Sequence, residues 1–400
     1  MGGGLMQLVA YGAQDIYLTG NPQITFFKVV YRRHTNFAVE SIEQTYNGSA
    51  SAGSKISVTV SRNGDLLSSV YLATKGSATI NSSLGQHFSN IDNVEVEVGG
   101  QVIDKQYGHW MQVWTDLSSP DDKADLLDRA ANGGTTEISH VPLQFWFCRN
   151  PGLALPLIAL QYHEVKLNIT FASDAVGLGP TSNVAVWCDY VFLDTDERRR
   201  FAQVSHEYLI EQVQFSNALS ASGTSTQHEL RFNHPVKELV WTVHDNSTPV
   251  DHDSDGGTAA IPNDTDITVK DALLQLNGHD RFKRREGKYF TTVQRYQYHS
   301  GAGNVCRRKP VDSTGKSMGD AGYNGNDVQA RADDSVPHVY SFALKPEEHQ
   351  PSGTCNFSRI DNAVLNLNHE SVTGGKLRVY AVNYNVLRIM SGMGGLAYSN

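Results

Sequence analysis

Short runs of alternating apolar and polar residues recur along most of the chain. In residues 56–60, 94–98, 165–171 and 363–367 every second side chain is apolar. A β-strand places alternate side chains on opposite faces of its sheet, so these runs predict strands with one buried face. Two further runs, 24–31 and 190–193, are apolar at nearly every position and predict strands that are covered on both faces.

Turn-forming residues separate these runs and leave little room for helices. The chain has 35 Gly and 13 Pro, with clusters of Ser, Thr, Asn and Asp between the apolar runs. One helix is predicted, over 121–131, because Ser119 and Pro120 can begin it and two glycines follow its end. Many short strands with few helices predict an all-β protein built from sandwiches or barrels.

The pattern occurs twice in the same order. Residues 63–71 align with 233–241, 96–100 with 274–278, and 190–193 with 384–387. Three collinear matches predict two tandem β-domains of common origin, with a boundary near 198–205.

Two long segments without apolar periodicity fall in the second half, at 244–266 and 300–337. Loops of this length in a compact domain are usually functional surface, so we expect these segments to carry surface contacts.

Composition and charge narrow the class of protein. Of 400 residues, 40% are hydrophobic, which suffices for extensive cores. The net charge of −9 argues against a surface built to bind nucleic acid, so no direct nucleic-acid partner is expected. Three basic clusters, 198–200, 281–285 and 307–309, are interpreted as solvated or inter-subunit charge.

The sequence predicts a soluble protein folded in a reducing compartment. The longest uncharged apolar stretch, 151–162, is about half the roughly 20 residues of a membrane-spanning helix. The N-terminus lacks the features of a secretory signal. The four cysteines lie far apart and form no Cys-x-x-Cys pair, which excludes a zinc ribbon and a disulfide framework.

The sequence shows no pattern of a catalytic centre. It contains no Gly-x-Ser-x-Gly elbow, no recognised catalytic cysteine signature and no phosphate-binding glycine loop between a strand and a helix. The segment from Asp251 to Asp255, followed by Gly256, begins like a calcium loop, but Pro262 stands where the bidentate Glu is needed. We interpret it as a solvated acidic loop and predict no catalytic residue, no metal site and no cofactor.

Six Asn-x-Ser/Thr sequons are present, and two of them are candidate glycosylation sites. Asn246 and Asn263 lie in the long 244–266 loop, where a glycan would be solvated. Asn168 lies inside a predicted strand and is a poor acceptor. The remaining sequons are at Asn47, Asn81 and Asn356.

Longer segments from end to end of the chain carry a family resemblance. The opening segment begins Leu-Val-Ala-Tyr-Gly-Ala-Gln-Asp-Ile-Tyr-Leu-Thr-Gly-Asn-Pro-Gln and extends over 8–28. It is followed by matching segments at 29–33, 35–37, 61–65, 99–104, 150–166, 189–194, 232–235, 276–278, 341–346, 350–362 and 383–398. Together they resemble the major capsid proteins of large icosahedral DNA viruses, with the chlorella virus (phycodnavirus) capsid glycoprotein as the nearest form. The loops at 75–88, 116–140, 244–266 and 300–336 depart from the family pattern.

The resemblance implies a double jelly roll of two tandem eight-stranded sandwiches. The expected division is an N-terminal arm at 1–20, a first jelly roll at 21–203 and a second at 204–400. The arm is expected to be extended and to lie on the inner side of the shell with few core contacts, the alternative being an ordinary frayed terminus.

The resemblance also implies partners and a location. The chain is expected to form homotrimers, which are pseudo-hexagonal capsomers that contact neighbouring capsomers. Minor capsid proteins are expected on the inner face and glycans on the outward loops. An internal membrane is expected nearby, which the chain does not span. The protein is thus expected in the outer capsid shell of a virion assembled in the host cytoplasm, as the principal shell protein or a less abundant paralogue.

Two other classes remain as alternatives. A carbohydrate-binding jelly roll would need exposed aromatic platforms, whereas most of the tryptophans (Trp114, Trp146, Trp187 and Trp241) lie in apolar runs and are interpreted as core. A cupin-like metal enzyme would need a His/Glu ligand cluster, which the sequence lacks.

Overall fold

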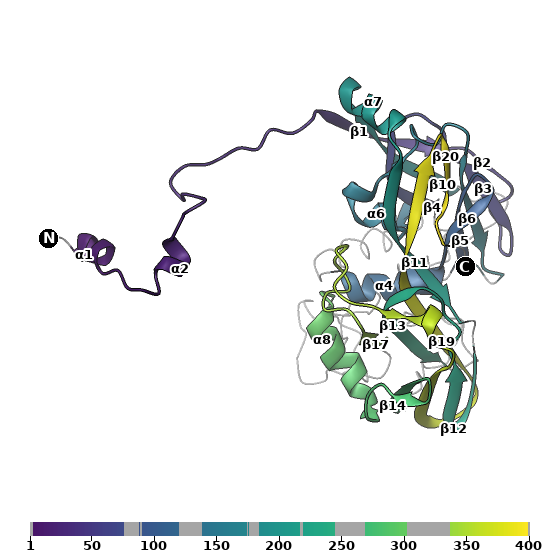
Figure 1. The fold of residues 1–400 in the computed structure, drawn as a ribbon. Helices are drawn as coiled ribbons and strands as arrows, with labels where there is room; N and C mark the ends of the chain where they lie inside the picture. Colours follow the sequence, from purple (N-terminus) through teal and green to yellow (C-terminus); the bar gives the residue numbers. More distant parts are fainter. Residues whose placement is uncertain are drawn as a thin grey trace, which may run out of the picture. The chain divides into compact units, whose positions relative to one another are not determined.

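The computed structural model describes residues 3–75, 88, 90–119, 138–173, 175, 184–216, 219–244, 269–301 and 337–398. The chain divides into two compact units, Met1–Asn36 and Phe37–Asn400 (Figure 1). Within the described ranges, every helix is too short or too polar to cross a membrane.

The first unit carries two short helices, α1 (Gly3–Val9) and α2 (Ile16–Thr19), and the described residues 3–36 contain no strand. Its large apolar side chains are exposed, including Phe26, Phe27 and Tyr31. The strand predicted over 24–31 is therefore wrong. These residues have strand propensity, but a strand also needs partners for its backbone hydrogen bonds, and no described strand pairs with them.

The second unit begins with a β-sandwich. Its strands are β1 (Phe37–Gln44), β2 (Tyr46–Asn47), β3 (Lys55–Thr59), β4 (Leu66–Lys75), β5 (Ile91–Val98), β6 (Gln101–Tyr107), β7 (Ile138–Pro142), β8 (Leu155–Pro156), β9 (Val165–Phe171) and β10 (Val184–Leu193). One sheet has the order β1-β10-β4-β7, with β8 beside β4, and the other has the order β2-β3-β9-β5-β6. The predicted strands at 56–60, 94–98, 165–171 and 190–193 all lie here, and their inward side chains form one core.

A second sandwich follows the helix α7 (Thr195–Gln203). Its strands are β11 (His206–Phe215), β12 (Leu219–Glu229), β13 (Pro235–His244), β14 (Val269–Leu276), β15 (His279–Asp280), β16 (Arg285–Glu286), β17 (His338–Ser341), β18 (Cys355–Asn356), β19 (Ala363–Met390) and β20 (Met393–Leu396). The long strand β19 pairs with β12 and β14 through its first part and with β11 and β13 through its last part. The strands beside the first part of β19 form one layer and those beside its last part form the other, and a separate core lies between the two layers.

The two sandwiches have the same topology. In each sandwich, one sheet has the first, eighth, third and sixth strand positions of the jelly roll side by side. This sheet is β1-β10-β4-β7 in the first sandwich and β11-β19-β13-β17 in the second. The other layer has the order β3-β9-β5-β6 in the first sandwich and β12-β19-β14-β15 in the second. This is the eight-position jelly roll, with β19 filling both the seventh and the eighth position. The predicted all-β class with two tandem jelly rolls is confirmed.

Equivalent hairpins confirm one part of the predicted repeat. Val98 pairs with Gln101 and Leu276 with His279, so each hairpin has a two-residue turn. Both turns have positive φ at both positions, 58° and 88° at Gly99-Gly100 and 50° and 79° at Asn277-Gly278. This is the type I′ geometry that Gly and Asn favour, so the alignment of 96–100 with 274–278 holds.

The other two repeat alignments are one residue out of register. Strand β4 bulges at Ser68 against β10, and strand β13 bulges at Lys237 against β19. Superposing the bulges makes Val70 equivalent to Leu239, where the sequence alignment placed Val240. The same correction applies to 190–193. A slip of one residue exchanges the two faces of a strand, so the corrected register decides which side chains are comparable.

The prediction of a single helix is wrong, and the segment 121–131 where it was placed lies outside the described residues. Besides α1 and α2, the described helices are α4 (Gly108–Ser118), α6 (Trp146–Arg149), α7 and α8 (Gln294–Tyr298), with one-turn segments η1 (Pro151–Leu153) and η4 (Phe357–Arg359) and the π-helical turn η2 (Tyr289–Val293). Helix α4 was missed although Trp110, Val113, Trp114 and Leu117 have the i, i+3, i+4, i+7 spacing of an apolar helical stripe, and nine of its eleven residues are buried. Helix α7 also carried a signal, since Asp194 caps it and Asp196 and Glu197 stand in its first turn.

Two equivalent glycines give a stability prediction for both sandwiches. A methyl group at Gly108 would lie 2.1 Å from the carbonyl oxygens of Phe88 and Ile91, and one at Gly287 would lie 1.9 Å from that of Val269. We therefore expect Gly108→Ala and Gly287→Ala each to lower the free energy of unfolding by about 1–3 kcal/mol or more, measured by urea denaturation. Gly4→Ala, with no atom within 4 Å, is the control. An unchanged unfolding midpoint for Gly108→Ala would contradict this packing.

Candidate functional site at the junction of the two sandwiches

Helix α4 belongs to the first sandwich in sequence but covers a sheet of the second (Figure 1). It follows β6 directly, and one side of it carries Met111 into the core of the first sandwich. Its other side places four apolar side chains in a third cluster together with residues of β11, β13, β17 and β19. These four are Trp110, Val113, Trp114 and Leu117, all at most 4% exposed.

Strand alternation explains how one sheet serves two cores. On β13, Leu239 and Trp241 face the core of the second sandwich, whereas Val240 between them faces α4. On β19, Tyr380 and Val382 likewise face α4. The outer face of this sheet thus carries an apolar patch of its own, and α4 supplies the surface that buries it. The ring centroids of Trp110 and Tyr380 lie 5.2 Å apart.

A buried ionic cluster lies beside this apolar contact. The Glu211 carboxylate on β11 lies 3.1 Å from Arg149 Nη1 at the end of α6 and 2.8 Å from Lys237 Nζ on β13. The Arg149 guanidinium also stacks on Trp114, with 4.1 Å from Cζ to the ring centroid. Arg149 and Trp114 come from the first sandwich and the other two residues from the second. The contact therefore joins the sandwiches through charge as well as apolar surface.

Lys237 is a fully buried lysine, and the strand bulge accounts for its position. Because Lys237 is the extra residue of β13, its side chain leaves the regular alternation of the sheet. Its ammonium reaches Glu211 and the carbonyl oxygen of Pro346, which lies 2.5 Å away. A buried ammonium is tolerated only with such partners.

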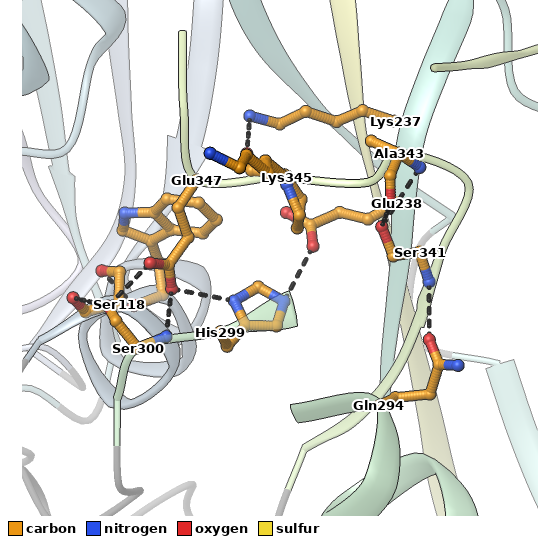
Figure 2. A network of polar contacts seen from close by, with 12 residues as sticks. Ser118, Lys237, Glu238, Gln294, His299, Ser300, Ser341, Ala343, Lys345 and Glu347 are labelled. Atoms are coloured by element: carbon orange, nitrogen blue, oxygen red, sulfur yellow. Dashed lines mark hydrogen bonds and ion pairs between the residues drawn. The ribbon is translucent and has the colours of Figure 1, made fainter. Parts of the chain in front are cut away.

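His299 forms the second half of the cluster (Figure 2). Its Nε2 lies 3.0 Å from Glu238 Oε2 on β13, and its Nδ1 lies 3.1 Å from Glu347 Oε1. Burial opposes charge on both His299 and Glu238, but the charged neighbours together outweigh it: Glu238 and Glu347 act on His299, and His299, Lys237 and Arg149 act on Glu238. The pKa of His299 is raised to about 9 and the pKa of Glu238 is lowered. Both groups are therefore charged at neutral pH, and three basic groups balance three acidic ones in the cluster.

The segment after α8 is tied to the end of α4. The Glu347 carboxylate accepts from the backbone N–H of Ser300 at 2.9 Å and from its hydroxyl at 2.6 Å. The Gly301 N–H donates to the Leu117 carbonyl at 2.8 Å. The orphan carbonyls at the end of α4 are thus satisfied by the second sandwich.

Asp104 makes a further link between β6 and β11. Its Oδ1 accepts from the backbone N–H of Val213 at 3.2 Å, and its Oδ2 accepts from Gln106 at 3.0 Å. Burial raises the pKa of Asp104 to about 6, against these hydrogen bonds. The Gln212 amide donates to the Ile103 carbonyl on the same two strands.

This arrangement is suited to joining surfaces rather than to chemistry. Its charged groups are buried and paired with one another, so none of them is poised to act on a ligand. In the described part of the chain no group of His, Cys, Asp and Glu could hold a metal ion. Burial raises the pKa of the Cys148 and Cys188 thiols to about 12 each, which makes both poor nucleophiles.

Some residues singled out in the sequence are placed and others are not. Asn246, Asn263 and the Asp251–Asp255 loop lie outside the described residues. Asn168 is 8% exposed and donates to Glu97, which agrees with a poor glycan acceptor. The basic clusters 198–200, on α7, and 281–285, before η2, have mostly exposed side chains. Trp114, Trp146 and Trp241 are core residues as predicted, whereas Trp187 is half-buried.

The junction itself was missed in the sequence. Arg149 and Glu211 stand 62 positions apart, and no motif links them or His299 to Glu238. The one available signal was Lys237-Glu238, a charged pair inside the apolar run 236–243, which is unusual for a buried strand.

Comparisons with known proteins agree on one family. The model described as major capsid protein N-terminus matches residues 25–194, and the model described as large eukaryotic DNA virus major capsid protein matches 197–307 and 331–395. The major capsid proteins of Pyramimonas orientalis virus and Paramecium bursaria Chlorella virus 1 are 52% identical over 419 residues and 43% identical over 470 residues, covering 100% of each chain.

Solved structures give the same result. A quasi-atomic model of the PBCV-1 virus capsid is 38% identical, with a TM-score of 0.76, and the match covers 94% of this chain and 100% of that one. The Faustovirus major capsid protein, at 12% identity, has a TM-score of 0.68 over 95% of this chain and 94% of that one, and so shares the fold.

The His299–Glu238 pair predicts a loss of stability in mild alkali. Because the folded-state pKa of His299 is raised from 6.5 to about 9, its contribution is complete below about pH 6.5 and is lost as the pH rises through about 9. We expect the free energy of unfolding to fall between pH 7 and 9 by up to about 1.4 kcal/mol per pH unit, measured by urea denaturation. This fall should be absent in His299→Gln and unchanged in the control His279→Gln, an exposed position. Parallel profiles for wild type and His299→Gln would contradict the assignment.

Proposed function

The chain belongs to the family of large eukaryotic DNA virus major capsid proteins, and we propose that three copies of it form a pseudo-hexagonal homotrimeric capsomer. As a member of this family it is a structural protein of the virion capsid and not an enzyme. The observation that carries the trimer proposal is the duplicated jelly roll with its fixed junction. Three chains supply six similar sandwiches, which is what a hexagonal outline with three-fold symmetry requires.

The junction supports this proposal because it makes the two sandwiches of one chain a single block. The apolar contact of α4 and the paired charges around Glu211 and Glu238 fix one sandwich against the other. A capsomer whose outline depended on a flexible linker would have no defined shape. The proposed division runs from an arm at 1–20 through a first jelly roll at 21–203, whose first strand begins at Phe37, to a second at 204–400, with the last boundary at the end of α7.

The proposal extends to the surroundings of the capsomer. Capsomers contact neighbouring capsomers in the outer shell and cover an internal membrane, which fits the finding that the described helices cannot cross a bilayer. Minor capsid proteins bind the inner face, and assembly takes place in the host cytoplasm. Glycans occupy outward loops, with Asn246 and Asn263 as candidates. The chain serves as the principal shell protein or as a less abundant paralogue.

The native mass of the purified chain tests the trimer. Light scattering should give about 132 kDa, three times the chain mass of 44.0 kDa, with any excess counted as sugar. A monomer at micromolar concentration would contradict the homotrimer.

Deleting residues 1–20 tests the proposed arm. Large apolar side chains in this segment are exposed, among them Leu8, Tyr17 and Leu18, so they add nothing to the cores of the sandwiches. We expect the truncated chain to remain trimeric and to keep its unfolding temperature but to fail in shell assembly, measured by electron microscopy of particles. Normal shells from the truncated chain would contradict a role of the arm at the inner face.

A further inference from the structure

The first sandwich has a sheet face equivalent to the one that α4 covers in the second, and this face is open. In the sheet β1-β10-β4-β7 the outward side chains are those that alternate with the core residues Val186, Cys188 and Tyr190 on β10. We define the open face by five outward residues that pair across these strands: Val39, Tyr71, Pro142, Trp187 and Val191. Val39 is 57% exposed, and the other four are partly exposed.

The equivalent positions in the second sandwich are all shielded by the first sandwich. Once the bulges at Ser68 and Lys237 are superposed, Tyr71 corresponds to Val240 and Trp187 to Tyr380. Val240 and Tyr380 are 0% exposed because α4 lies on them. The two sandwiches therefore differ in that one sheet face has a helix from a neighbouring sandwich and the other has none.

The second sandwich carries a helix equivalent to α4, and that helix also has an open side. Gly108 and Gly287 occupy the same place, since each fits closely against the first residue of an equivalent strand, Ile91 of β5 and Val269 of β14. Three residues further on, Met111 and Phe290 enter the cores of their own sandwiches. The η2–α8 helix thus stands where α4 stands in the first sandwich (Figure 1).

The residues that dock α4 have exposed counterparts on η2–α8. Counting from the two glycines, the four docking residues Trp110, Val113, Trp114 and Leu117 correspond to Tyr289, Thr292, Val293 and Tyr296. The four on α4 are at most 4% exposed, whereas Val293 is 40% and Tyr296 is 91% exposed. An exposed Val and Tyr one turn apart form an apolar strip that no described part of the chain covers.

We propose that the η2–α8 helix of one copy docks on the open face of the first sandwich of the next copy, repeating between chains the contact that α4 makes within a chain. The partner is a second copy of this chain. The contact is head-to-tail, because the helix and the sheet face are different surfaces of the protomer. Three copies form a closed ring when the contact between chains rotates one sandwich relative to the next by the same angle as the junction within a chain does. This inference rests on the proposed trimer and names the surfaces that would form it.

Charge favours the same partner. The exposed Lys288 lies immediately before η2, and the exposed Glu43 lies on β1 on the same side as Val39, where it pairs with Trp187 of the open face. In a chain with a net charge of −9, a local basic segment next to an apolar strip is suited to an acidic surface of its own kind.

Two sets of substitutions test the two surfaces separately. Val293→Asp with Tyr296→Asp changes the helix strip, and Val39→Asp with Val191→Asp changes the open face. Each double variant should shift the native mass from about 132 kDa to that of the 44.0 kDa monomer, measured by light scattering. The matched control is Val102→Asp, which lies on the opposite sheet and is 44% exposed, and it should remain trimeric.

Mixing the two variants tests the head-to-tail geometry. The helix variant keeps an intact sheet face, and the sheet variant keeps an intact helix. An equimolar mixture should therefore form a one-to-one dimer of about 88 kDa, twice the chain mass, and no ring. A mixture that stays monomeric would overturn the head-to-tail contact.

The outcomes separate this inference from the proposed function. A wild-type trimer with either double variant still trimeric would overturn the docking surfaces and leave the trimer standing. A wild-type monomer would overturn the trimer itself. Circular dichroism and thermal unfolding show whether each variant is folded. If the Asp variants unfold, Ser at the same four positions removes the apolar side chains without adding charge and gives the same readout.

Discussion

The burial of one sheet face by helix α4 is the contact on which the arrangement of the second unit depends. A jelly roll buries the inner faces of its two sheets and normally leaves the outer faces to solvent. Here the outer face of β11-β19-β13-β17 carries Val213, Val240 and Tyr380, which would be costly to expose together. The tryptophans of α4 bury this face against the first sandwich. The second sandwich therefore cannot separate from the first without exposing an apolar layer, and the pair behaves as one body.

The buried charges beside α4 determine the relative orientation of the two sandwiches more than they add to the stability of the contact. Desolvating six charged groups offsets most of what their pairing contributes, so an ionic cluster of this kind is a weak source of stability. A mispaired arrangement, however, would leave a buried lysine or glutamate without a partner, at a cost of several kcal/mol. The cluster of Arg149, Glu211 and Lys237 therefore penalises any other angle between the sandwiches, whereas the apolar contact alone would tolerate sliding.

Much of the fold could be predicted from local pattern, and the junction could not. At 56–60, 94–98 and 165–171 apolar residues recur at every second position, so these strands can be recognised in a single sequence. The prediction of a strand at 24–31 failed because strand propensity does not tell whether a neighbouring strand is available to pair with it. Helix α4 was missed although its sequence carries a signal, since Trp110, Val113, Trp114 and Leu117 have the spacing of an apolar helical stripe. The ionic cluster joins residues that are distant in sequence, and only the register of the strands, bulges included, brings them together.

The differences between equivalent positions follow from when each surface is buried. The internal contact forms as the chain folds, so its sheet face can carry Glu238 and Lys237, which have partners at once. At the bulge-aligned positions the first sandwich has Ser69 and Ser68, and Ser69 donates a hydrogen bond to Asp189 on the neighbouring strand. In the proposed arrangement this face meets its partner only when another copy arrives. Side chains such as Tyr71 and Trp187, which are stable half in water, suit a surface that must stay soluble until then. A duplicated domain can thus make one contact permanent and its counterpart reversible by changing a few side chains on the same framework.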